Sequence, residues 1–122
     1  MNTSTPPLKG RRILLVEDDY FLVRGLVNYF EAAGAEIAGP VAGLQPALQI
    51  AKTERLDGAV LDIDLKGECS PPVAATLLGR NVPFVFVTGY DATALPEPYS
   101  KVPRCQKPAE PSTVAWKLFQ AK

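Results

Sequence analysis

The sequence predicts an α/β domain in which helices cover both faces of a doubly wound, five-stranded parallel sheet. Strand-like and helix-like patterns alternate along the 122 residues, as in a chain of β–α units. The strand-like runs are continuously apolar rather than alternating, which is typical of parallel strands buried on both faces. With 47% hydrophobic and 21% charged residues, a chain of this length is expected to form one globular domain around a single core.

Five strands are expected, each a short apolar run that ends on a polar residue or a turn. They lie at 12–16, 35–38, 58–62, 83–88 and, more weakly, 102–106. The second of them is closed by the turn dipeptide Gly39-Pro40. The fourth, FVFV, is apolar throughout, so it is predicted to lie inside the sheet.

Helices are predicted where apolar residues recur at steps of three and four. They lie at 20–33, at about 44–51, from 71 onward and from about 111 onward. Gly34 is placed as the stop of the first helix, and Pro46 is tolerated only in the first turn of the second. The third helix is expected to turn Leu77 and Leu78 toward the core.

Three stretches lack these periodicities. Residues 1–10 are polar and contain proline, so we expect a flexible tail ahead of a domain at 11–122. Residues 63–70 are expected to be a loop. Two prolines interrupt 89–101, so any fourth helix there is reduced or irregular.

Composition and charge argue against several classes of function. The formal net charge is zero, so we expect neither nucleic acid nor an anionic membrane as a partner. The chain has no histidine, which excludes imidazole catalysis and histidine-ligated metal sites. No apolar stretch approaches the length of a membrane span, and the first residues lack a secretory signal. Cys69 and Cys105 lack zinc-type spacing, so we expect reduced thiols, or less often a disulfide, in a cytoplasmic protein.

Four of the strand-like runs lead into residues with charged or hydrogen-bonding side chains. These are Glu17, Asp18 and Asp19 after the first strand, Asp62 at the end of the third, Thr88 at the end of the fourth, and Lys107 after the fifth. The carboxyl ends of parallel strands lie along one edge of a sheet, where ligands bind. Carboxylates there suit a divalent cation such as Mg²⁺, while a hydroxyl and an ammonium suit the oxygens of a phosphoryl group.

Each of these residues also has an ordinary structural explanation. Acids are stabilised at a helix N-terminus by its dipole, and an aspartate after a strand is usually a turn former. Three adjacent acids after a buried strand nevertheless oppose one another's ionisation, which Mg²⁺ would relieve. Beside such a metal, the carboxylate of Asp62 is suited to attack phosphorus and form an acyl phosphate. The order of acids, aspartate, threonine and lysine is more specific than any one of them.

The stretch from Arg12 to about Phe119 resembles a receiver domain of two-component response regulators. More narrowly, GECSPPVAATLLGRNVPFVFVTGY at 67–90 is similar to the FATGY-type receivers, with FVTGY at 86–90. The resemblance implies the flavodoxin-like, CheY-like fold with strand order 2-1-3-4-5. It also implies a stand-alone phosphoacceptor rather than an enzyme. Such a domain takes its phosphoryl group from a sensor histidine kinase or a phosphotransfer protein, and then binds a downstream protein or passes the phosphate on.

The resemblance further implies a metal-binding set. Asp62 would be the phosphoacceptor, and Mg²⁺ would be bound by Asp18, Asp62 and the backbone carbonyl of Asp64. Glu17, the other member of the acid pair, would contact the metal through water. Asp19 lies one position beyond that pair and would have no part in the metal site.

The remaining roles concern the phosphoryl group and the switch. Thr88 and Lys107 would bind the phosphoryl group, and the Lys107–Pro108 peptide would be cis. Ordinary receivers carry an aromatic switch residue where this chain has Arg104. Tyr90, two residues after Thr88, would take its place as the switch.

Two other interpretations are open at this stage. The segment 61–64, Leu-Asp-Ile-Asp, resembles the nucleophile motif of haloacid-dehalogenase-type phosphatases, which are Mg²⁺-dependent enzymes. In that family, however, the acidic pair follows the nucleophile, and this chain is too short for a cap domain. The other is a pseudo-receiver, a binding module that is not phosphorylated, although Asp62, Thr88 and Lys107 are all present.

Overall fold

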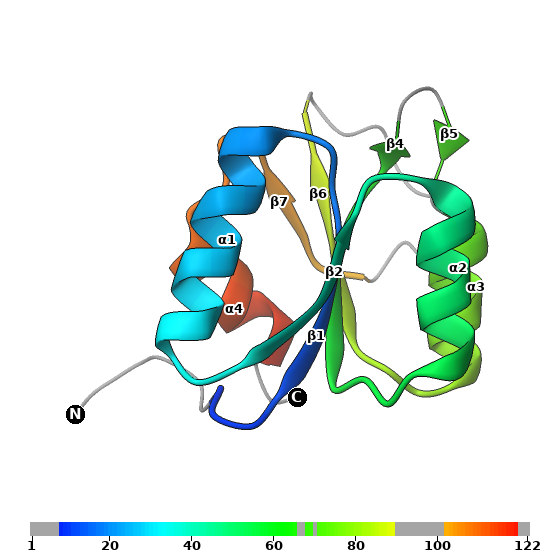
Figure 1. Ribbon diagram of the computed structural model, residues 1–122. Coiled ribbons are helices and arrows are strands. Elements are labelled where there is room, and N and C mark those ends of the chain that lie inside the picture. The colour runs from blue at the N-terminus through cyan, green and yellow to red at the C-terminus, as the bar shows by residue number, and fades with distance from the viewer. Residues whose placement is uncertain (1–7, 66–67, 70, 90–101, 120–122) are drawn as a thin grey trace.

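The computed structural model describes residues 8–65, 68–69, 71–89 and 102–119 (Figure 1). The strands are β1 (Arg12–Val16), β2 (Glu36–Val41), β3 (Gly58–Asp62), β4 (Asp64–Leu65), β5 (Glu68–Cys69), β6 (Phe84–Thr88) and β7 (Arg104–Gln106). The helices are α1 (Tyr20–Ala32), α2 (Leu44–Thr53), α3 (Pro71–Gly79) and α4 (Pro111–Phe119).

Five of these strands form one sheet in the order β2-β1-β3-β6-β7, and all its neighbouring strands are parallel. Helices α1 and α4 cover one face of the sheet, and α2 and α3 cover the other (Figure 1). Counting only the strands of this sheet, the order is 2-1-3-4-5. The predicted doubly wound fold is therefore confirmed.

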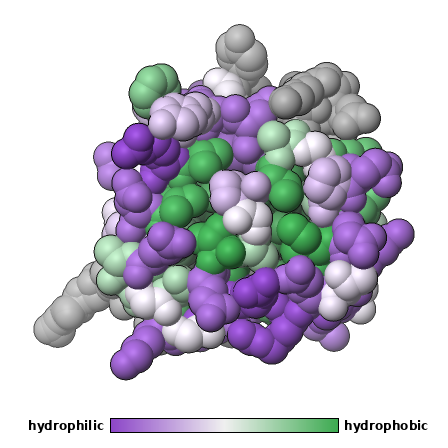
Figure 2. Space-filling view, viewed as in Figure 1, coloured by the Kyte–Doolittle hydropathy of each residue, from purple (hydrophilic) through white to green (hydrophobic). Residues whose placement is uncertain are grey.

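Two apolar layers hold the helices to the sheet. Leu14, Leu61 and Phe86 belong to the layer under α2 and α3, while their strand neighbours Leu15 and Val60 belong to the layer under α1 and α4. Alternate residues of one strand therefore enter different layers, which explains why the strands are apolar at every position. In Figure 2 hydrophobic residues of both layers lie between the polar outer surfaces of the helices.

The second strand is longer than predicted. It continues through Gly39-Pro40 to Val41, and its register with β1 shifts there, from Leu14 opposite Ala38 to Val16 opposite Val41. The Gly39–Pro40 peptide is cis. A proline is tolerated because β2 is an edge strand, where not every N–H is needed for pairing. The prediction that Gly39-Pro40 ends the strand was therefore wrong.

Other differences are local. Leu8, in the stretch predicted to be a tail, is buried, and Gly10 donates a backbone hydrogen bond to Gly34, so the packed domain includes these residues. The segment predicted to be a loop at 63–70 contains the antiparallel pair β4–β5. Leu78 is 40% exposed rather than turned inward. The expected irregular fourth helix lies outside the described residues, apart from Gly89.

Within the described ranges, no helix has both the length and the apolar character that crossing a membrane requires.

Candidate functional site

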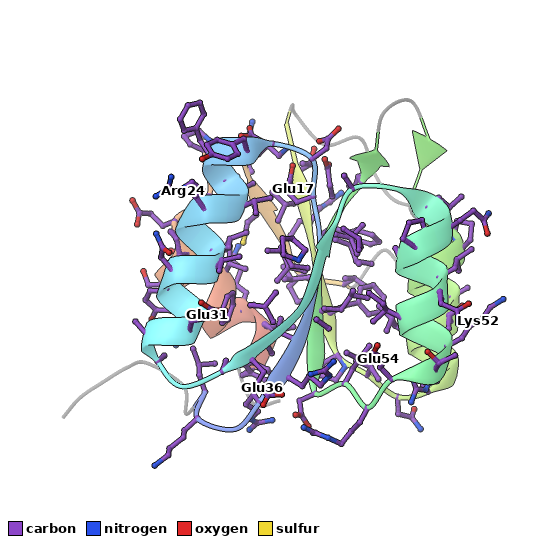
Figure 3. All side chains as sticks on the ribbon, viewed as in Figure 1. Glu17, Arg24, Glu31, Glu36, Lys52 and Glu54 are labelled. Atoms are coloured by element: carbon purple, nitrogen blue, oxygen red, sulfur yellow. The ribbon has the colours of Figure 1, made fainter. Side chains whose placement is uncertain are left out.

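The predicted site residues meet at the carboxyl ends of the central strands. Val16 pairs with Leu61, so Glu17 and Asp62, the residues that follow them, are neighbours at the sheet edge. Asp62 pairs in turn with Val87, one residue before Thr88. In Figure 3 Glu17 lies at the upper edge of the sheet, whereas Glu36 and Glu54 lie toward the opposite edge.

Three carboxylates form a cluster at this edge. Glu17, Asp18 and Asp62 each offer an oxygen, and the three oxygens lie within 4.8 Å of one another. Glu17 and Asp62 are only 2% and 4% exposed, because Glu17 directly follows β1 and Asp62 is the last residue of β3, two strands that the two layers bury. Asp18 is exposed, so the cluster has one side open to solvent.

The two oxygens of Glu17 are in different situations. Oε2 accepts hydrogen bonds from the Asp19 amide at 3.1 Å and from Lys107 Nζ at 2.8 Å. Oε1 is buried and accepts none from any residue that the structure describes. A buried carboxylate oxygen without a donor is costly, and a hard cation with oxygen ligands would satisfy it. The donor set therefore fits a divalent metal such as Mg²⁺.

Lys107 supplies the positive charge of the cluster. Its Nζ lies 2.8 Å from Glu17 Oε2 and 3.5 Å from Asp62 Oδ2. Burial by itself would lower the pKa of Lys107, but the hydrogen bond to Glu17 and the negative charges of Glu17 and Asp62 raise it above its usual value. The ammonium therefore stays charged while it is partly buried. The Lys107–Pro108 peptide is cis, as the resemblance implies.

Solved structures of other proteins share this fold. SdrG from Sphingomonas melonis Fr1 is 34% identical in sequence, with a TM-score of 0.78 and a match that covers 89% of this chain and 93% of that one. The receiver domain from the hybrid histidine kinase CckA is 26% identical, with a TM-score of 0.71, and the match covers 89% of this chain and 96% of that one.

A response regulator protein from Burkholderia pseudomallei is 18% identical, with a TM-score of 0.78, and the match covers 88% of this chain and 66% of that one. No protein-family model and no curated protein sequence matches the chain. SdrG is one of the response regulator receiver domains among these structures. Its sequence identity with this chain and the coverage of both chains therefore decide the family. This chain is a response regulator receiver domain of the CheY-like type. Its structural relatives are signalling domains rather than catalytic enzymes.

Asp19, for which the sequence predicted no part in the metal site, has a structural role in this receiver. Its Oδ1 accepts hydrogen bonds from the amides of Phe21 at 3.1 Å and Leu22 at 3.2 Å, so it caps the N-terminus of α1. Its own amide donates to Glu17 Oε2. Its position just before the periodic apolar residues of the first helix is the usual signal for an N-cap.

The other predicted residues of the receiver site are placed in part. The Lys107 amide donates to the carbonyl oxygen of Thr88 at 2.7 Å, so the main chains of these two residues are linked. Asp64 is the first residue of β4, two residues beyond Asp62. Tyr90 lies outside the described residues. The roles of Thr88 and Asp64 remain predictions.

A pocket of about 300 Å³ lies beside the cluster, between the start of α1 and the segment after β7. Most of its lining is apolar; it consists of Asp19, Phe21, Leu22, Gly25, Lys107, Pro108, Ala109 and Pro111. Phe21 is 82% exposed at the rim. Lys107 thus lies between the acidic cluster and an apolar surface that is open to solvent.

Proposed function

We propose that this receiver accepts a phosphoryl group on Asp62, with Mg²⁺, from the phosphohistidine of a sensor histidine kinase or a phosphotransfer protein. The position of Asp62 carries the proposal. Its carboxylate is nearly buried at the end of β3, belongs to the acidic cluster and lies 3.5 Å from the ammonium of Lys107. A group placed in this way combines a nucleophilic oxygen, a metal-binding site and a positive charge for the incoming phosphoryl oxygens.

Asp18, Asp62 and the backbone carbonyl of Asp64 would hold Mg²⁺, and Glu17 would contact the ion through water. The buried Glu17 Oε1, which has no donor among the described residues, supports this set. The bound ion would neutralise carboxylate charge that otherwise repels a phosphoryl group. The Burkholderia protein, described with a phosphorylated aspartic acid and a calcium ion, has the same fold, and Ca²⁺ also prefers oxygen ligands.

In the transfer step, an oxygen of Asp62 forms a bond to phosphorus while the bond from phosphorus to the donor histidine nitrogen breaks. The released imidazole takes up a proton from solvent. The phosphoryl group brings close to two negative charges to Asp62, and Lys107 then has a new acceptor beside Glu17. Thr88 donates its hydroxyl to another phosphoryl oxygen. Because the main chains of Thr88 and Lys107 are hydrogen bonded, both residues respond to the same event.

Phosphorylation would be read out by a downstream protein or passed on to another carrier. The segment after Thr88, with Tyr90 as the switch residue of a FATGY-type receiver, would change conformation and present the binding surface. The apolar pocket beside Lys107 is a surface against which the phosphodonor would pack. We place this exchange in the cytoplasm.

The test is phosphorylation by acetyl phosphate with Mg²⁺, measured by intact mass. Wild type should gain one phosphate and Asp62→Asn none. Asp57→Asn is the matched control, since it makes the same change at the opposite end of β3. Equal labelling of wild type and Asp62→Asn would refute the assignment. A wild type that stays unlabelled with acetyl phosphate and with a phosphorylated kinase would instead indicate a pseudo-receiver.

A further inference from the structure

Strand β2 contributes no side chain to the acidic cluster, yet its main chain reaches the cluster. The carbonyl oxygen of Val41 accepts a hydrogen bond from the Glu17 amide at 3.0 Å. This contact exists because of the irregularity in β2. Two steps along β1, from Leu14 to Val16, correspond to three steps along β2, from Ala38 to Val41. The extra residue is taken up at Gly39-Pro40, and it brings the Val41 carbonyl to the residue that follows β1.

We propose that Gly39 is a positioning residue for the metal site. It allows the irregularity that places the Val41 carbonyl against the Glu17 amide, and it thereby holds the buried Glu17 carboxylate in the cluster. This inference rests on the proposed function, since it assumes that the cluster binds Mg²⁺.

Only glycine suits this position. Gly39 has φ of +100°, a conformation that residues with a side chain rarely adopt. A Cβ at this position would lie 2.8 Å from the Val41 nitrogen and 3.1 Å from the Leu15 oxygen. Both are backbone atoms, one on each of the two strands whose pairing leads to Glu17. A side chain here would therefore push β2 and β1 apart just before the Glu17–Val41 hydrogen bond.

Glu17 is sensitive to such a displacement because its carboxylate has little freedom. Its side chain is fully buried, and Oε2 is held by the Asp19 amide and by Lys107. A shift of its main chain would move the carboxylate relative to Asp62 and Asp18. Groups that orient metal ligands without touching the metal typically change metal affinity by about 10–100-fold when they are altered.

Gly34 provides a matched control. It has φ of +95°, so alanine there incurs a similar backbone cost. A Cβ at Gly34 would meet Lys9, with its Cα at 3.1 Å. Gly34 lies before β2 at the amino end of the sheet, away from Glu17. The two substitutions thus share the strain of a positive φ and differ in whether they disturb the acidic cluster.

The experiment is calorimetric titration of Mg²⁺ into wild type, Gly39→Ala and Gly34→Ala, at a temperature where circular dichroism shows each protein to be folded. Gly39→Ala should weaken Mg²⁺ binding about tenfold, and Gly34→Ala less than about twofold. An unchanged affinity in Gly39→Ala, or equal weakening in both variants, would overturn the proposal. If the wild type itself binds no Mg²⁺, the metal site of the proposed function fails, and this inference fails with it.

A second measurement uses the wild type alone and serves if Gly39→Ala does not fold. On Mg²⁺ addition, the amide resonances of Gly39 and Val41 should shift more than that of Ile37, which lies on the same strand farther from the cluster. Equal or smaller shifts at Gly39 and Val41, in a protein that does bind Mg²⁺, would show that β2 is not coupled to the site.

Discussion

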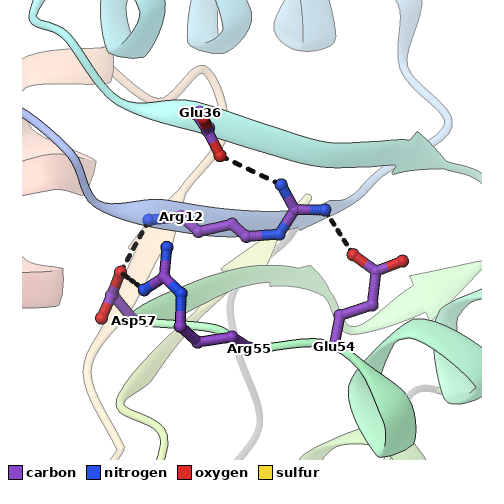
Figure 4. Close-up of polar contacts among 5 residues, drawn as sticks. All are labelled: Arg12, Glu36, Glu54, Arg55 and Asp57. Carbon is purple, nitrogen blue, oxygen red and sulfur yellow. Dashed lines mark hydrogen bonds and ion pairs between the residues drawn. The ribbon is translucent and has the colours of Figure 1, made fainter.

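At the amino end of the sheet, Arg12 of β1 binds the carboxylates of Glu36 on β2 and Glu54 after α2, while Arg55 binds Asp57 ahead of β3 (Figure 4). At the carboxyl end, three carboxylates lie within 4.8 Å of one another, and Lys107 contacts two of them. Each of the three acids at the first end has a guanidinium partner, with Glu36 and Glu54 sharing that of Arg12. At the second end, the three carboxylates of the described cluster have one ammonium, against two guanidinium groups at the first end, so the excess of negative charge is larger at the second end.

The two ends of the sheet therefore differ in role: the ion pairs at the amino end stabilise the fold, and the acidic cluster at the carboxyl end is suited to binding a ligand. The amide of Arg12 donates to Asp57 Oδ2 at 2.8 Å, and this hydrogen bond, with that of Arg55, lowers the pKa of Asp57 below its usual value. The network at the amino end thus joins β1, β2, α2 and β3 and needs no further ion. The carboxyl end keeps a buried oxygen without a donor among the described residues, on Glu17, and so favours binding of a cation.

The largest expected effect comes from removing the ammonium of the carboxyl end. Lys107→Met should lower the free energy of unfolding in EDTA by about 2 kcal/mol, because a charged hydrogen bond to the buried Glu17 is lost. Mg²⁺ should then raise the melting temperature more than it does in wild type, since it becomes the counter-charge of the cluster. Lys52→Met, on the exposed face of α2, is the control and should change neither quantity appreciably. An unchanged stability of Lys107→Met in EDTA would contradict this description of the cluster.

A second prediction makes the same substitution at both ends. Glu17→Gln should weaken Mg²⁺ binding about tenfold, because one carboxylate of the cluster loses its charge. Glu36→Gln should leave the Mg²⁺ affinity unchanged and cost about 0.2–1 kcal/mol of stability, as expected for an exposed ion pair. Calorimetric titration and urea unfolding measure the two quantities. Loss of Mg²⁺ affinity in both variants would show that the two ends are not independent.

The smallest effect concerns acid pH at the amino end. The folded state lowers the pKa of Asp57, so its stabilising contribution is present above the unfolded pKa of about 3.9 and is lost as the pH falls through the lower folded value. Asp57→Asn should therefore be less stable than wild type at neutral pH, and this difference should shrink between about pH 5 and pH 2. Urea unfolding of wild type and Asp57→Asn over a pH series measures this difference in stability. A difference that stays constant with pH would mean that the ionisation of Asp57 contributes nothing.

The sequence predicted the architecture well where the signal was local. Continuous apolar runs indicated buried parallel strands, and helical periodicity indicated the layers on both faces. The end of β2 was misjudged because Gly39-Pro40 usually marks a turn, whereas here an edge strand accommodates it. The pair β4–β5 was missed because two-residue strands carry no periodicity.

The same division applies to the site. Its location could be predicted from the chain because parallel strands bring their carboxyl ends to one edge, so the residues at or directly after the ends of β1, β3 and β7 had to meet. Which of these side chains contact one another could not be predicted, because those contacts depend on strand register and on residues far apart in the chain. The ammonium of Lys107 lies nearer to Glu17 than to Asp62, and the amide of Glu17 is held by Val41 across an irregular edge strand. Local pattern decides which residues end a strand, and packing decides which of them touch.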